Sequence, residues 1–134
     1  MKKAILVAIG LPLILSAMDL GAEERFGMEV YTGAEYEESA SEFLQESGAK
    51  AFCYRTGDKM TAVIDFYKEK EGLYLISEDD SGAFFRRCAG EEYNKIFDRM
   101  MPKDCDLDIT VQSPWMNMKT EKINNDTLIS FTER

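Results

Sequence analysis

Apolar residues recur with the two-residue period of strands in several short segments after residue 22. The clearest is residues 106–112, where Leu107, Ile109 and Val111 alternate with polar positions and predict a strand with one buried and one wet face. Segments rich in aromatic and branched side chains predict four more strands, over residues 50–56, 73–77, 83–88 and 127–132.

Other segments show the spacing of three and four residues that is typical of amphipathic helices. One set of apolar residues predicts a helix over residues 59–70: Met60, Val63, Ile64 and Tyr67. A second set predicts a helix over residues 91–101, ended by Pro102: Tyr93, Ile96, Phe97, Met100 and Met101. Residues 37–46 predict a shorter helix, and residues 113–126 are expected to form a loop.

From residue 50 the expected order is strand, helix, strand, strand, helix, strand, with one more strand at the end. That order is the β-α-β-β-α-β arrangement of a split βαβ unit. We therefore predict an α+β domain with an antiparallel sheet of about five strands, two to three helices and a ferredoxin-like core. A helix wrapped by a differently ordered antiparallel sheet would give similar patterns, so the topology stays open.

Residues 1–22 differ from the rest of the chain. Lys2 and Lys3 precede an almost unbroken apolar run of 15 residues, Ala4 to Met18, and small residues follow it. This pattern is typical of a bacterial secretory signal peptide, and the run is shorter than the ~20 residues of a membrane-spanning helix. We predict cleavage after Ala22, with Ala17 as the alternative, which leaves residues 23–134 as a single domain in the periplasm or outside the cell.

The composition excludes several classes of chemistry. The 134-residue chain has no histidine, which removes histidine-based catalysis and most zinc and haem sites. Its net charge is −9, and removal of Lys2, Lys3 and Asp19 with the leader leaves 14 basic and 24 acidic residues, a net charge of −10. A chain with this much negative charge repels phosphate backbones, and we therefore expect no nucleic-acid partner. We also expect no membrane contact after the leader is cleaved.

The three cysteines predict one disulfide bond, because an exported protein meets an oxidising compartment. Spacing alone allows three pairings. We favour Cys88–Cys105, as a bridge that fastens the two flanks of the helix expected over residues 91–101. Cys53 lies in the middle of a strand, where a buried free thiol behaves as a small apolar residue.

Several segments resemble small secreted bacterial domains of unknown function, in which a YPGA turn precedes a strand and a helix ending in FYK leads to the next strand. The matching pieces are VYTGAEY (30–36), CYRTGD (53–58), VIDFYKEKEGL (63–73), SPWMNMKT (113–120) and NDTLI (125–129). Thr32 stands where those domains have proline. The resemblance implies an exported α+β domain and brings no activity with it.

Trp115, Met116 and Met118 form the candidate binding surface, because exposed tryptophan and methionine commonly anchor interfaces. We expect replacement of Trp115 by alanine to weaken partner binding more than folding. Thioether ligands also suit Cu(I), which makes a copper carrier the alternative use of Met116 and Met118.

No other group of residues predicts a metal or cofactor. Asp104, Asp106 and Asp108 have the spacing of three EF-hand ligands, but Ile109 and Trp115 replace the glycine and glutamate that the loop requires. We therefore interpret the three carboxylates as one solvated face of a strand.

The sequence leads to three hypotheses about function. The first is an exported, non-enzymatic domain that binds another exported protein or a small ligand, since no nucleophile–base pair is present. The second is a hydrolase that uses two carboxylates, for which a deep cleft with facing acids would be required. The third is the methionine-based copper carrier.

Overall fold

The computed structural model describes residues 23–134, and the chain divides after Thr32 into two units that are described separately. In the first unit, β1 (Glu24–Arg25) and β2 (Met28–Glu29) pair antiparallel. Phe26 and Gly27 make the turn between them with positive φ angles. The predicted signal peptide, residues 1–22, lies outside the described residues.

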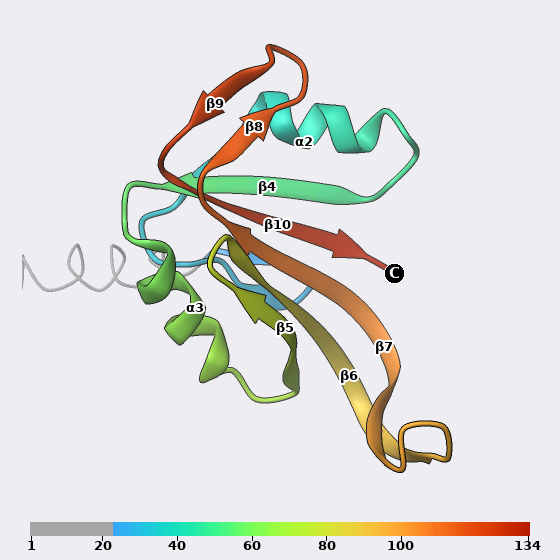
Figure 1. The fold of residues 1–134 in the computed structure, drawn as a ribbon. Coiled ribbons are helices and arrows are strands. Elements are labelled where there is room, and N and C mark those ends of the chain that lie inside the picture. The colour runs from blue at the N-terminus through green and yellow to red at the C-terminus, as the bar shows by residue number, and fades with distance from the viewer. Residues whose placement is uncertain (1–22) are drawn as a thin grey trace, which may run out of the picture. The chain divides into compact units, whose positions relative to one another are not determined.

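The second unit, Gly33–Arg134, is built on one six-stranded antiparallel sheet (Figure 1). The strand order across the sheet is β3-β4-β10-β7-β6-β5. Its strands are β3 (Glu35–Tyr36), β4 (Ala51–Thr56), β5 (Leu73–Asp79), β6 (Gly82–Asn94), β7 (Arg99–Gln112) and β10 (Thr127–Glu133). Two helices, α2 (Glu38–Gln45) and α3 (Met60–Lys68), pack against it.

The predicted ferredoxin-like α+β core is wrong. Strands make up 53% and helices 15% of the described residues, so the protein is mostly β. A split βαβ unit needs a second crossover helix, and the segment expected to supply it, residues 91–101, lies in β6, β7 and the turn between them. The individual predictions for α2, α3, β4, β5 and β10 are correct to within a few residues.

The two faces of the sheet are covered differently. On one face α3 packs through Val63, Ile64 and Tyr67, which are buried. The Tyr67 ring lies 6.1 Å from the rings of both Phe85 and Phe131, at tilted and edge-on angles that aromatic pairs favour. The expected inward face of β7 belongs to this core, since Leu107, Ile109 and Val111 are buried.

The opposite face carries α2, over β4 and β10. Ala40 of α2 is buried with Cys53 of β4 and Leu128 of β10. Ser41 ties the helix to the sheet, because its hydroxyl accepts a hydrogen bond from the Cys53 backbone N–H at 2.7 Å. Figure 1 shows α2 on one side of β4 and β10 and α3 on the other.

The hairpin of β6 and β7 replaces the helix expected over residues 91–101. In that segment Tyr93 lies opposite Met100 across the hairpin, Met101 lies opposite Glu92, and Ile96 and Phe97 lie in the turn. A turn of four residues, 95–98, joins the strands. The spacing of three and four residues in this segment is therefore produced by residues on the two strands and the turn of a hairpin, not by one face of a helix. Most of these side chains are exposed rather than buried.

The Cys88–Cys105 disulfide is confirmed, but its place differs from the expected one. The two cysteines face each other across β6 and β7, with Cα atoms 3.9 Å apart, instead of flanking a helix. The register shifts at this point, between Arg87 and Cys88. Such bulges bend a strand and increase its twist, and Figure 1 shows both strands curving away from the rest of the sheet.

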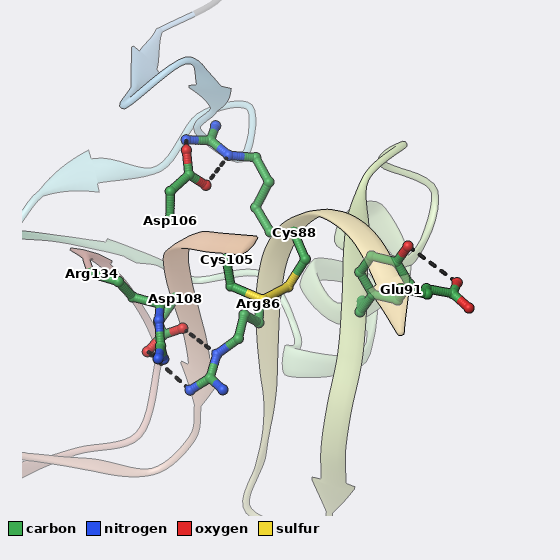
Figure 2. The surroundings of a disulfide bond; sticks show 9 residues. Arg86, Cys88, Glu91, Cys105, Asp106, Asp108 and Arg134 are labelled. Atoms are coloured by element: carbon green, nitrogen blue, oxygen red, sulfur yellow. Dashed lines mark hydrogen bonds and ion pairs between the residues drawn. A yellow bond between two sulfur atoms is a disulfide. The ribbon is translucent and has the colours of Figure 1, made fainter. Parts of the chain in front are cut away.

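Ion pairs surround the disulfide (Figure 2). Asp108 accepts hydrogen bonds from Arg86 at 2.8 Å and from Arg134 at 3.4 Å. Arg87 donates to Asp106 at 2.8 Å. Arg86 and Arg87, which are adjacent on β6, thus pair with different carboxylates of β7, Asp108 and Asp106.

β5 forms one edge of the sheet. Its pairing with β6 is interrupted by a register shift between Leu75 and Ser77. Leu75 and Ile76 are exposed on this edge, and Glu78 and Asp79 follow them.

Residues 113–126, expected to be a loop, contain a second small sheet. β8 (Trp115–Asn117) and β9 (Lys122–Asn124) pair antiparallel, with Met116 opposite Ile123. Three-residue strands are too short for a periodic sequence signal, which is why they were not predicted.

Candidate functional site

A pocket of about 270 Å³ lies on the α2 face of the sheet, between α2 and the β8–β9 hairpin. Phe43 and Leu44 of α2 line one side, and Met116 and Met118 line another. Its remaining wall consists of Ala40 of α2, Leu128 of β10 and small or polar residues of the sheet: Cys53, Thr110, Gln112, Ser130 and Thr132. We call this site the α2–β8 pocket.

The α2 side of the pocket is apolar because of the pattern of the helix. The Glu37 carboxylate caps α2 by accepting a hydrogen bond from the Ala40 N–H at 3.2 Å. From that start, Ala40 and Leu44 lie one helical turn apart, and Phe43 lies beside Leu44 at the rim.

The β8–β9 hairpin is fixed to α2 by polar contacts. The Ser39 hydroxyl donates to the Asn117 side-chain oxygen at 3.2 Å, and Asn117 is itself buried. Lys119 bridges to Glu42 of α2 and to Glu46 at the C-terminal cap of the helix, at 3.1 Å in each case. The two sides of the pocket are therefore held to each other and not only to the sheet.

Trp115 packs against residues that line the pocket, in a buried cluster with Ala40, Cys53 and Leu128. Its side chain is only 3% exposed, and its Nε1–H donates to Asp126 at 2.9 Å. The Arg55 guanidinium lies 5.1 Å from the ring centroid, within the range of a cation–π contact. Arg55 also donates to Asp126 at 2.7 Å and to Glu37 at 3.1 Å, and so links β4, α2 and the end of the β8–β9 hairpin.

This arrangement affects the acidity of Asp126. Its partial burial acts to raise the pKa, but the hydrogen bonds from Arg55 and Trp115 outweigh that effect and hold the pKa of Asp126 below its usual range. The carboxylate is therefore ionised at neutral pH and serves as a fixed acceptor.

The candidate surface predicted from the sequence divides in two. Met116 and Met118 are 45% and 54% exposed and line the pocket, where a ligand can reach them. Trp115 belongs to the buried cluster with Ala40, Cys53 and Leu128. Trp115 is therefore not part of an exposed surface, and its replacement is expected to affect folding directly. The effect of that replacement on binding stays a prediction.

Cys53 is a free, buried cysteine at the inner wall of the pocket. Burial raises the pKa of its thiol, and the nearby hydroxyls of Ser130 and Ser41 only partly oppose that effect. The protonated thiol is a poor nucleophile, so the arrangement favours a packing role for Cys53 over a catalytic one.

The carboxylates considered as calcium ligands have other partners. Asp106 and Asp108 are engaged by the arginines around the disulfide. Within residues 23–134 no cluster of three or more Cys, Asp or Glu side chains is arranged to hold a metal ion.

Sequence reasoning missed Phe43, Thr110, Gln112 and Thr132 as pocket residues. Thr110 and Gln112 come from the polar face of β7, which was expected to be exposed to solvent, and Thr132 comes from β10. One sequence signal could have indicated these pocket residues. The helix predicted over residues 37–46 has apolar residues that need a partner, and the polar face of a strand is available to cover them.

No protein-family model, curated protein or solved structure matches the chain. The resemblance to small secreted domains therefore stays a prediction. Among the described residues, no helix is both long enough and apolar enough to cross a bilayer.

Proposed function

We propose that the protein is an exported, non-enzymatic binding domain that takes an apolar group of a partner protein or small ligand into the α2–β8 pocket. The observation that carries this proposal is the exposure of Met116 and Met118, which together with Phe43 line a cavity of about 270 Å³. Methionine side chains adapt to irregular apolar ligands. The cavity is slightly smaller than the ~300–1,000 Å³ of small-molecule sites, which favours a single apolar group.

The composition of the pocket wall favours binding over hydrolysis. None of the described residues that line it is charged, whereas a carboxylate hydrolase needs two acids facing its substrate. The disulfide bond supports export, because such bonds persist in oxidising compartments.

The proposal is tested by titrating the protein with indole, followed by amide chemical shifts. We expect saturable shifts at the amides around the pocket. Thr110 is an exposed residue of the pocket wall, so Thr110→Trp should fill the cavity without disturbing the core and abolish those shifts. The matched control is Thr61→Trp, which places the same ring at an exposed position of α3.

Two outcomes would contradict the proposal. Indole shifts that spread evenly over the surface would show that the pocket has no preference for an apolar ring. Equal shifts in the Thr110→Trp and Thr61→Trp variants would place the binding elsewhere.

A further inference from the structure

The β6–β7 hairpin continues beyond the disulfide as a two-stranded arm, residues 89–104, which we call the distal arm. Its end exposes four large apolar side chains. Ile96 is 85% exposed, Phe97 59%, and Tyr93 and Met100 54% each. Four large apolar side chains exposed within eight residues make this end of the arm a candidate contact surface.

The polar backbone of this apex is satisfied from within. The side-chain oxygen of Asn94 accepts hydrogen bonds from the N–H groups of Ile96 and Phe97, at 2.9 and 3.1 Å. The Tyr93 hydroxyl donates to the Asp98 carboxylate. Such a turn can enter a poorly hydrated environment without leaving these groups unpaired, and an unpaired group would oppose the transfer.

The charge of the apex is opposite to that of the rest of the domain. Residues 95–99 contain two basic residues, Lys95 and Arg99, and one acid, Asp98, whereas the arm as a whole carries three basic and four acidic residues and the predicted mature chain is strongly acidic. Lys95 and Arg99 flank the two apex residues, and the Arg99 guanidinium lies 5.7 Å from the centre of the Phe97 ring. Lys103 lies farther from the apex and pairs with Glu92 at 3.8 Å.

The length of the arm separates these charges from the acidic body. β6 continues for six residues beyond Cys88, to its end at Asn94, which corresponds to roughly 20 Å of extended strand. The Debye length at physiological ionic strength is about 8 Å, so an approaching surface meets the local positive charge of the apex first.

We propose that the distal arm docks on an anionic lipid bilayer, with Ile96 and Phe97 at the boundary of headgroups and acyl chains and Lys95 and Arg99 against anionic headgroups. A convex apolar apex flanked by cations matches a fluid anionic surface, which needs no preformed pocket to receive it. This proposal concerns a different surface from the α2–β8 pocket and departs from the sequence-based expectation of no membrane contact.

The test uses the full chain with an added tryptophan as a local fluorescence probe. The signal of the native Trp115, measured in the unsubstituted protein, is subtracted so that the readout comes from the probe. Phe97→Trp places the probe at the apex, and Ile123→Trp places a matched probe at an exposed position of β9. Vesicles of phosphatidylglycerol and phosphatidylcholine, carrying brominated acyl chains, should blue-shift and quench the Phe97→Trp signal alone. Vesicles of phosphatidylcholine alone should bind roughly tenfold more weakly.

A second pair of variants tests the apolar contact. Ile96→Ser, in the Phe97→Trp background, should weaken apex quenching by roughly tenfold, whereas Ile123→Ser in that background should leave it unchanged. Absence of quenching at the apex would overturn the proposal, and so would equal quenching of the two probes. Light scattering that shows lipid-free self-association abolished by Ile96→Ser would assign the arm to a second copy of the chain instead.

Discussion

The same two strands, β6 and β7, behave differently on the two sides of the Cys88–Cys105 bridge. On the sheet side, Phe85 is flanked by β5 and β7 and covered by α3, and it is fully buried together with Leu107 and Ile109. On the far side, Tyr93 and Met100 lie opposite each other and are exposed. Both halves have the same ladder of backbone hydrogen bonds, so burial rather than pairing distinguishes them. An isolated two-stranded hairpin is only marginally stable in water, and the bridge therefore matters most to the distal arm.

The largest expected difference between the two halves is in the effect of removing a phenylalanine ring. Phe85→Ala should lower the free energy of unfolding by about 3–5 kcal/mol, because it opens a cavity among α3, β6 and β10. Phe97→Ala should change it by less than about 0.5 kcal/mol, because that ring is already hydrated. Urea denaturation of both variants measures the difference, and a loss above about 1.5 kcal/mol for Phe97→Ala would contradict the comparison.

Removal of the bridge should have the next largest effect. The cysteines are 17 residues apart, and the chain-entropy model gives about 3 kcal/mol for a loop of this size. The double variant Cys88→Ser with Cys105→Ser should unfold at lower urea, and its amide hydrogens should exchange faster in the distal arm than on the sheet side of the hairpin.

Thiol counting provides the control for that experiment. The native protein, unfolded without reductant and alkylated, should take up one label, on Cys53. Equal acceleration of exchange on both sides of the bridge would show that the distal arm does not depend on it more than the sheet does.

The smallest expected effect concerns Asp106, at the boundary between the two halves. The hydrogen bond from Arg87 lowers the pKa of Asp106 from its usual value of 3.8, and the slight burial only partly opposes it. Because the folded-state pKa is depressed, the ion pair contributes stability above the unfolded-state pKa and loses it as the pH falls through the folded-state value.

Asp106→Asn should therefore reduce stability at neutral pH, and the difference from the native protein should vanish in strong acid. The Asp106 side chain is 64% exposed, so the effect should stay below about 1 kcal/mol. Denaturation curves collected from acid to neutral pH test it, and a difference that grows toward low pH would reverse the sign argued here.

The comparison of the two halves also explains which elements could be predicted from the sequence. Met60, Val63, Ile64 and Tyr67 predicted α3 correctly, since all but Met60 are buried on one side of a helix and the pattern reports burial. The spacing of Tyr93, Ile96 and Phe97 predicted a helix wrongly. Periodicity indicates secondary structure only where one face is buried, and at the distal arm these side chains face solvent.

The candidate site shows the same division. Met116 and Met118 were predicted to lie on an exposed surface, and both side chains are exposed. Their neighbours in the sequence are mostly polar, so no apolar cluster forms locally around them. Trp115 was misplaced because its partners, Arg55 and Asp126, come from β4 and from the residue before β10. Arg55 lies about 60 residues before Trp115 in the chain, and a contact at that separation leaves no local pattern.

The register shift in β5 has a consequence for aggregation. Unpaired edge strands can add strands from other molecules and so begin intermolecular sheets, and natural proteins limit this with bulges and charged residues. On β5 the shift between Leu75 and Ser77 breaks the regular ladder, and Glu78 and Asp79 place negative charge beside it. A second chain that approaches this edge meets an irregular backbone and negative charge, both of which disfavour the addition of a strand. Leu75 and Ile76 can therefore remain exposed without promoting fibril formation.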